Sequence, residues 1–270
     1  MAASPTAVYE QLLALRRAGS ACVLVTLVES LGSVPQDTGA KLLVGPGGLL
    51  AGTVGGGRVE ARAVATALEL LAAPGPERGR PRFVNWSLKG DVGMTCGGSV
   101  KLYFEPYPAG GYAWTIAVFG AGHIAQALLP VLLPLPAAIR CHDSRPEWIG
   151  RLPAAPNLRA AVADDLAAVL GDLPADAFVL CMTQGHTTDR PILQRALTAH
   201  AFPFLGVIGS DAKAAILRRE LEADGVPADL AARFHCPVGL PFGTNHPHEI
   251  ALSIAAQLVS ERDRLWAAPP

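Results

Sequence analysis

A glycine-rich turn in the second half of the chain is a motif with a defined chemistry. The apolar run WTIAVF leads into Gly120–Ala125, whose letters GAGHIA fit the pattern G-x-G-x-x-A. In a strand–turn–helix unit the first glycine permits a tight turn, and the second lets a pyrophosphate approach the backbone. The helix that follows offers free N–H groups to an anion. The pattern therefore predicts that Gly120, Gly122 and His123 contact a phosphorylated ligand.

An acid and a base follow the next predicted strand. Asp143 ends the run AAIRCHD, 21 residues after Gly122, and Arg145 stands two residues further on. An acid at this position can accept hydrogen bonds from a ribose, and an arginine there can meet a phosphate. The spacing favours a Rossmann-type unit that binds a nucleotide-like ligand. The alternative is a Rossmann-type turn that binds nothing, or that binds a ligand other than NAD. Hydride transfer is disfavoured, because no acid or base stands out beside a nicotinamide site.

A second glycine cluster lies in the first half of the chain. Gly55, Gly56 and Gly57 precede a predicted helix that carries Glu60 in its first turn. Consecutive glycines expose backbone N–H groups, and a helix start adds partial positive charge. The segment is therefore an anion cradle or, as the alternative, a place where two backbones pack closely.

One cysteine differs from the others in its surroundings. Cys96 stands between a loop and a strand and is followed by Gly97 and Gly98, whereas Cys22 and Cys181 lie in apolar strands where packing explains them. A cysteine in such a loop could be a thiolate nucleophile, a sulfur carrier or a soft-metal ligand. The alternative is a small buried thiol in a tight loop. Cys141 is predicted to be structural.

A further candidate follows the fourth predicted strand of the second half. His186 lies where ligands bind in doubly wound sheets, so it is either a ligand contact or a loop histidine. Asp189 is predicted to cap the next helix. The segments 235–237 and 246–248 contain histidines and a cysteine, but their spacing is not that of a zinc site.

Strands and helices alternate regularly after residue 111, which predicts a parallel sheet with helices on both faces. The predicted strands are 114–119, 137–142, 158–162, 176–181 and 203–208. The predicted helices are 122–134, 164–170, 189–199, 210–224 and 247–265. The fold class is therefore α/β, with a C-terminal Rossmann-type doubly wound sheet over residues 112–270.

The first 111 residues are glycine-rich and less regular, which predicts a smaller α+β domain. An opening helix begins near Pro5 and a second spans 58–71. The predicted strands are 21–28, 40–44, 48–52, 82–88 and 99–105.

Composition excludes several classes of protein. The chain has 270 residues, of which 50% are hydrophobic and 17% charged, so disorder is excluded. A formal net charge of −1 disfavours a nucleic-acid partner. Five cysteines without a C-x-x-C pair argue against a disulfide framework and a structural zinc module. Residues 106–139 contain no Lys, Arg, Asp or Glu, but their prolines, glycines and His123 favour buried elements over a membrane span. No signal peptide is recognised, and a cytoplasmic location is expected.

The motifs together resemble the XdhC/CoxI family, which are accessory proteins of molybdenum hydroxylases such as xanthine dehydrogenase. The matching segments are GSVPQDTGAKLLV (32–44), GTVGGGRVE (52–60), GMTCGG (93–98), FGAGHIA (119–125), HDSR (142–145), VIGS (207–210), HCPVGL (235–240) and HEIALSIAAQL (248–258). They span nearly the whole chain in order. Within the family, the compact length of the chain and its intact Rossmann half favour the XdhC branch over CoxI.

The resemblance implies a molybdenum cofactor chaperone and not an enzyme with catalytic residues. Such a protein binds and protects molybdenum cofactor (molybdopterin), supports its sulfuration with a cysteine desulfurase, and inserts it into the xanthine dehydrogenase apoenzyme. The resemblance also implies a homodimer. In this setting Cys96 could contact the molybdenum. Gln184-Gly185 and Asp211-Ala212 depart from the family pattern and make that edge less basic.

Two other functions remain open. The first is an NAD(P)-dependent oxidoreductase of Rossmann type, and the second is a sulfurtransferase that carries a persulfide on Cys96. For the chaperone we expect Cys96 and the loop 55–57 to face the turn 120–125 across a cleft between the domains.

Overall fold

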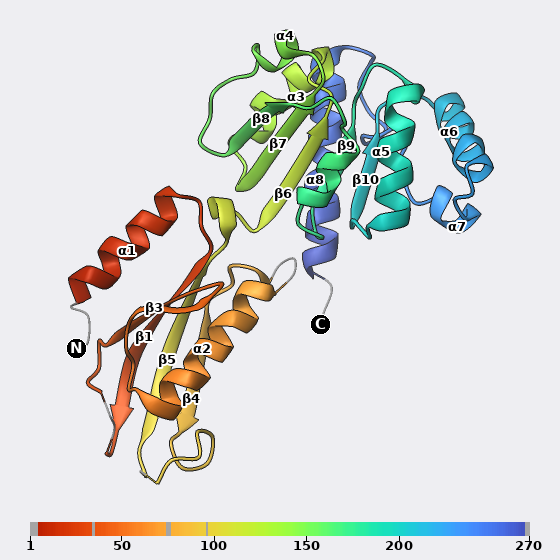
Figure 1. Ribbon diagram of the computed structural model, residues 1–270. Coiled ribbons are helices and arrows are strands. Elements are labelled where there is room, and N and C mark those ends of the chain that lie inside the picture. The colour runs from red at the N-terminus through yellow and green to blue at the C-terminus, as the bar shows by residue number, and fades with distance from the viewer. Residues whose placement is uncertain (1–4, 34–35, 74–76, 96, 268–270) are drawn as a thin grey trace. The chain divides into compact units, whose positions relative to one another are not determined.

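The computed structural model describes residues 5–33, 36–73, 77–95 and 97–267. The chain divides into two compact units, Met1–Ala113 (unit 1) and Trp114–Pro270 (unit 2) (Figure 1). Unit 1 is built on an antiparallel sheet and unit 2 on a parallel one.

Unit 1 contains a five-stranded sheet in the order β3-β2-β1-β5-β4, and each adjacent pair is antiparallel. Its elements are α1 (Pro5–Arg17), β1 (Cys22–Leu31), β2 (Lys41–Gly45), β3 (Gly48–Gly52), α2 (Gly57–Ala72), β4 (Arg82–Ser87), β5 (Ser99–Tyr107) and the short 3₁₀ turn η2 (Ala109–Gly111). The smaller α+β domain predicted from the sequence is confirmed.

The two helices of unit 1 pack on opposite faces of its sheet. Along β5 buried and half-buried residues alternate, as expected of a strand with one covered face. Helix α2 places Val59, Ala63 and Leu70 in the larger core beneath that face. Helix α1 packs Val8 on Leu24 and its neighbours on the other face.

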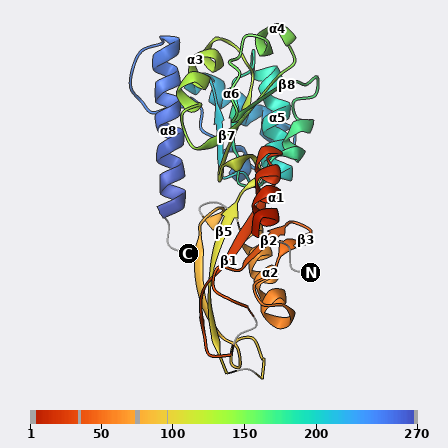
Figure 2. The same cartoon turned by 90° about the vertical axis from the view of Figure 1, so that its left-hand side faces the viewer.

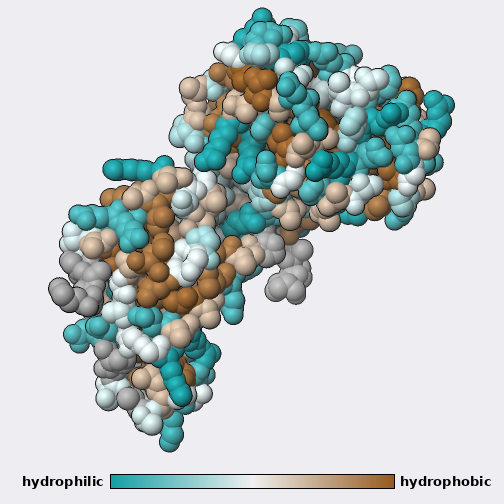
Figure 3. All heavy atoms as spheres, in the orientation of Figure 1, coloured by the Kyte–Doolittle hydropathy of each residue, from teal (hydrophilic) through white to brown (hydrophobic). Residues whose placement is uncertain are grey.

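Apolar side chains remain exposed on unit 1. Tyr9 and Leu13 of α1 are 46% and 54% exposed, and Leu49 and Leu50 of β3 are 46% and 40% exposed. Figure 3 shows brown apolar side chains gathered over this part of unit 1. Exposed apolar patches often mark contact surfaces.

Unit 2 contains a parallel sheet in the order β10-β9-β6-β7-β8. Its strands are β6 (Trp114–Phe119), β7 (Ala137–Asp143), β8 (Leu158–Val162), β9 (Phe178–Cys181) and β10 (Phe204–Val207). Its helices are α3 (His123–Leu132), α4 (Pro146–Ile149), η3 (Ala168–Asp172), α5 (His186–Ala199), α6 (Asp211–Ala223), α7 (Ala228–Ala231) and α8 (Pro247–Ala267). This strand order is that of the doubly wound Rossmann fold, which confirms the predicted fold class.

Helices cover both faces of the parallel sheet. Helices α3 and α8 pack with Ile116, Val118 and Phe178 on one face, while α5 and α6 pack with Ala117 and Phe119 on the other. Figure 2 shows α3 and α8 on one side of β7 and α5 and α6 on the other. Among the described residues, no helix is long and apolar enough to span a bilayer.

The helix predicted over 164–170 is wrong. The structure has only the 3₁₀ turn η3 there, from Ala168 to Asp172. The carboxylate of Asp165 accepts a hydrogen bond from the N–H of Ala168 at 3.0 Å, and Gly171 and Pro174 follow within a few residues. Residues of these types stop a helix before a second turn can form.

Candidate functional site

The glycine turn of unit 2 lies where the order of the strands reverses. Because all five strands are parallel, the turn after β6 and the segments after β7 and β9 lie at one edge of the sheet. The chain runs from β6 outward to β8 and then returns to β9 on the other side of β6. Ligands of doubly wound sheets bind at such a switch point. We call this edge the switch-point edge.

The two glycines of the turn meet different demands. Gly120 has φ +106°, and a side-chain carbon added there would lie 2.3 Å from the carbonyl oxygen of Met182. At Gly122 an added carbon would have no neighbour within 4 Å. Gly120 is therefore required by close packing of the two segments, whereas Gly122 leaves open space beside the start of α3. The position of Gly122 fits a turn that a phosphate can approach.

Asp143 is buried beside the turn, and protein groups occupy both of its carboxylate oxygens. The residue is only 3% exposed. Oδ2 accepts hydrogen bonds from the N–H of Ala121 at 2.7 Å and from Nη2 of Arg145 at 2.7 Å. Oδ1 accepts from the backbone N–H and the Nε of Arg145 at 2.9 and 2.8 Å. Burial by itself would raise the pKa of Asp143, but the hydrogen bonds from Arg145 and Ala121 outweigh it and lower the pKa.

Arg145 links two of the segments at the switch-point edge. With the amide oxygen of Gln184 turned toward it, Nη1 of Arg145 donates to that oxygen at 2.8 Å. The guanidinium also lies over the ring of Trp148, 5.1 Å from its centroid, and Arg151 lies over the same ring at 4.7 Å. The ring of His123 meets Trp148 edge-on at 4.8 Å. Two arginines and a histidine therefore surround one indole beside the glycine turn.

A pH prediction follows from Asp143. Because its folded-state pKa lies below the unfolded value of about 3.9, its stabilisation is fully present above roughly pH 5 and is lost as pH falls through the folded pKa. Replacing Asp143 by Asn is expected to flatten the acid limb of the stability curve. Urea unfolding of both proteins between about pH 3 and pH 7 measures this. An unchanged acid slope would contradict the prediction.

A buried ion pair lies beside the switch-point edge, after β9 and β10. The side chain of Asp189 is 0% exposed, and its Oδ2 lies 2.6 Å from Nζ of Lys213, whose side chain is 20% exposed. Lys213 also donates to the carbonyl oxygen of Ile208 at 2.8 Å. Thr183 donates to Oδ1 of Asp189 through its hydroxyl at 2.6 Å and its N–H at 3.3 Å. Asp189 therefore joins the loop after β9 (residues 182–185, the β9 loop) to α6.

Sequence reasoning missed this network. It predicted Asp189 as a helix cap, which is wrong, because the cap position of α5 is Gly185. Lys213 escaped notice because its partner is 24 residues away. The predicted ligand residue His186 is exposed at the first position of α5, with Nε2 4.0 Å from a carboxylate oxygen of Glu220. Its role as a ligand contact stays a prediction.

The three motif-bearing loops of unit 1 gather at one end of its sheet. Leu31 and Ser87 both pair with Ser99, so the loops 32–40 and 88–98 leave the sheet at the same end. The loop 53–56 joins them, because β3 ends beside the start of β2. A side-chain carbon added at Gly32 would lie 3.2 Å from the Cα of Gly98, so the first two loops are in contact.

The predicted anion cradle in this loop cluster has internal hydrogen bonds. The N–H groups of Gly55 and Gly56 both donate to the hydroxyl of Thr53, at 3.2 and 3.1 Å. An added carbon at Gly56 or Gly57 would have no neighbour within 4 Å, so the tip of the turn is open. Glu60 lies in the first turn of α2 as predicted. Arg58 Nη1 donates to the carbonyl oxygen of Gly93 and ties this turn to the loop 88–98.

Cys96 lies outside the described residues, so its roles as nucleophile, sulfur carrier or molybdenum contact stay predictions, as does the cleft in which it would face the turn 120–125. Of the residues that the structure describes, no three His, Cys, Asp or Glu side chains are grouped to hold a metal ion. Cys22, Cys141 and Cys181 are buried, which confirms packing. Burial, and secondarily Asp143, raise the pKa of the Cys141 thiol to about 12.

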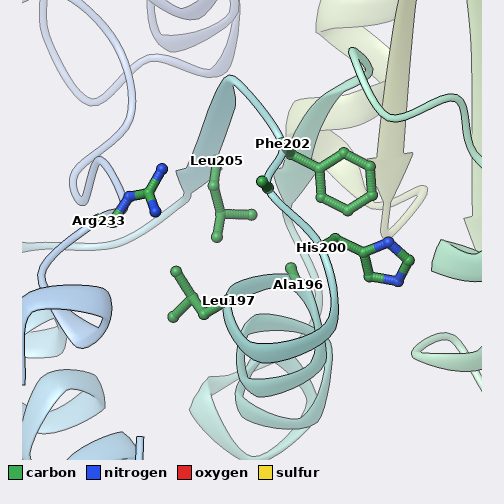
Figure 4. Close-up of a pocket in the computed structure, with 7 residues that line it drawn as sticks. Ala196, Leu197, His200, Phe202, Leu205 and Arg233 are labelled. Atoms are coloured by element: carbon green, nitrogen blue, oxygen red, sulfur yellow. The ribbon is translucent and has the colours of Figure 1, made fainter. Parts of the chain in front are cut away.

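A small hollow in unit 2 lies at the opposite edge of the sheet. Ala196, Leu197, His200, Ala201, Phe202, Leu205 and Arg233 line it (Figure 4). It lies at the amino end of β10, whereas the glycine turn lies at the carboxyl ends of the strands. The ring of His200 stacks on Phe202 with a centroid distance of 4.9 Å. The hollow is therefore separate from the switch-point edge.

Two family models match this chain. One, described as the XdhC Rossmann domain, matches residues 116–258, and the other, described as the XdhC and CoxI family, matches residues 15–83. These matches cover both units.

Three known proteins are similar along most of the chain. The uncharacterized protein YqeB of Escherichia coli K12 is 28% identical over 242 residues, which is 89% of this chain but 43% of YqeB, so the chain spans less than half of that relative. The molybdenum cofactor insertion chaperone PaoD of the same organism is 26% identical over 281 residues, covering 90% of this chain and 84% of PaoD. A crystal structure of a xanthine dehydrogenase from Bacillus halodurans matches with 20% identity and a TM-score of 0.47, covering 97% of this chain and 98% of the other.

Proposed function

Because this chain belongs to the XdhC and CoxI family, we propose that it binds molybdenum cofactor and inserts it into a molybdoenzyme. The observation that carries the proposal is the similarity to the insertion chaperone PaoD, which extends over 90% of this chain and therefore over both units. The molybdenum cofactor is the cargo in this proposal. The protein has to bind, shield and release it, and needs no catalytic residue.

The switch-point edge of unit 2 fits one part of this cargo. Molybdopterin carries a phosphate, and the open space at Gly122 lies beside the first N–H groups of α3, which have no partners within the helix. Arg145 and His123 lie beside the same turn. We assign the phosphate of the cofactor to Gly122, His123 and Arg145.

The proposal extends to partners and setting. The acceptor would be the xanthine dehydrogenase apoenzyme, and a cysteine desulfurase would supply sulfur while the cofactor is held. The protein would be a cytoplasmic homodimer. The exposed apolar side chains of α1 and β3 are the surface that unit 1 offers to a protein partner.

One experiment tests the function directly. Purified protein is incubated with molybdenum cofactor, the molybdenum and pterin that it retains are measured, and the loaded protein is mixed with apo-xanthine dehydrogenase. We expect about one cofactor per chain and faster activation than with free cofactor. Parallel titration with NADPH addresses the oxidoreductase alternative. Retention of NADPH but not of cofactor would contradict the proposal.

A Gly122→Ala variant is expected to separate binding from stability. The added methyl group has no protein neighbour within 4 Å and φ is −66°, so the free energy of unfolding should fall by less than about 1 kcal/mol. The same methyl group enters the space that the phosphate would occupy, so cofactor affinity should fall at least about tenfold. Equilibrium binding and thermal unfolding of the same preparation measure the two effects. Unchanged affinity would show that the cofactor does not bind at this turn.

A further inference from the structure

We propose that Asp143 is a positioning residue, and that Arg145 selects ligands at the switch-point edge by the charge of a phosphate ester and not by the hydroxyl groups of a ribose. The inference rests on the proposed function and specifies what its site recognises. It also revises the expectation from the sequence that Asp143, the acid at the end of β7, accepts hydrogen bonds from a ribose.

The contacts of Asp143 carry the first step. Four N–H groups donate to its two oxygens, at 2.7–2.9 Å, and all four belong to Ala121 and Arg145. The side chain is buried, so a ribose could reach it only by displacing charge-assisted hydrogen bonds. The bond to Ala121 fixes the middle of the glycine turn. Asp143 therefore acts on a ligand through the turn and through Arg145.

The contacts of Arg145 carry the second step. Asp143 holds Nε and Nη2 of its guanidinium in a two-pronged arrangement. The amide oxygen of Gln184, an exposed side chain on the β9 loop, accepts from the remaining Nη1 at 2.8 Å and also lies 3.0 Å from Nε. A neutral, exposed amide is a weaker acceptor than an anionic phosphate oxygen, so a phosphate ester can replace it. Arg145 is thus held in place on one side and available to an anion on the other.

The neighbours of Arg145 agree with an anionic ligand. Arg151 and Arg145 both lie over the ring of Trp148, and His123 contacts the same ring. Glu147 is an acidic neighbour of Arg145, but its side chain is exposed to solvent. The ligand class that follows is a phosphate ester such as that of molybdopterin, with or without a ribose.

The test compares ligands that have a ribose with ligands that lack one. Asp143→Asn, with Glu147→Gln as the charge-matched control, is titrated calorimetrically with molybdopterin, inorganic pyrophosphate and NADH. We expect Asp143→Asn to weaken every ligand that binds the wild type by about tenfold, the ribose-free ones included, at unchanged stoichiometry. Glu147→Gln removes a negative charge that acts on Arg145 but no hydrogen bond to the turn, so it should bind each ligand at least as tightly as the wild type. A loss confined to NADH would overturn the inference, and so would a lower stoichiometry at unchanged affinity, which indicates misfolding alone.

Two further measurements separate this inference from the proposed function. If the wild type binds none of the three ligands, the proposed function fails. Hydrogen exchange at the amide of Ala121 then tests the positioning role of Asp143 separately. At least tenfold faster exchange in Asp143→Asn supports the positioning role, and unchanged exchange overturns it. If Asp143→Asn does not fold, Arg145→Gln is used, because it leaves the bond from Ala121 to Asp143 in place. Weaker binding of pyrophosphate supports the role of Arg145, and unchanged binding overturns it.

Discussion

A Gly120→Ala variant is expected to lose about 3–5 kcal/mol of its free energy of unfolding. The new methyl group would lie 2.3 and 2.5 Å from the carbonyl oxygen and carbon of Met182, and 2.9 Å from the nitrogen of Thr183. All three atoms are backbone, so no side chain can rotate away. The φ of +106° adds strain for any residue with a side chain.

Gly120→Ala should also weaken ligand binding, because the glycine turn after β6 packs against the loop after β9 at this point. The glycine turn and the β9 loop must move apart to admit the methyl group, which displaces Gln184 and Thr183 from their partners. Denaturant unfolding of Gly120→Ala beside Gly122→Ala measures the effect, since both changes add one methyl group to the same turn. Similar stabilities of the two variants would contradict the close approach to Met182.

Replacing Asp189 by alanine is expected to cost about 3 kcal/mol of stability. The change leaves the ammonium of Lys213 without its carboxylate, and it also removes the acceptor of Thr183. The value lies at the lower end for broken buried pairs, because the side chain of Lys213 is 20% exposed and can turn toward water. Chemical denaturation at neutral pH gives the difference directly.

Two control variants define the origin of this loss. In Asp189→Ala/Lys213→Met no charge remains unpaired, so this double variant should be more stable than Asp189→Ala alone. The carboxylate side chain of Asp263 is 62% exposed and pairs with Arg262 on the surface. Asp263→Ala should therefore change stability by less than about 1 kcal/mol. A double variant less stable than Asp189→Ala would mean that Lys213 contributes by packing and not by charge.

Much of unit 2 could be predicted from the sequence, because its signals are local. The apolar run before Gly120 predicted β6, and the G-x-G-x-x-A pattern predicted the turn and the start of α3 at His123. The segment 164–170 was mispredicted as a helix, because apolar spacing alone does not register the effect of Gly171 and Pro174.

The candidate site could be predicted in its residues but not in its contacts. Asp143 and Arg145 were recognised from their distance to the turn, yet sequence spacing could not show that each occupies the other's hydrogen-bonding groups. The role of Trp148 was not predicted, since a single tryptophan after a strand has no characteristic spacing. The pair of Asp189 and Lys213 was missed for the same reason, because its members lie on separate helices.

The sequence by itself determined the fold class, the glycine turn and the family, because these depend on residue types that are close together along the chain. Only the tertiary structure decided which of these residues are free to meet a ligand. The parallel sheet brings the carboxyl ends of β6, β7 and β9 to one edge. There the carboxylate of Asp143 accepts hydrogen bonds from Ala121 and Arg145 and is not free for a ligand. Hydrogen bonds between residues distant in sequence depend on how strands are ordered, and no local pattern specifies that order.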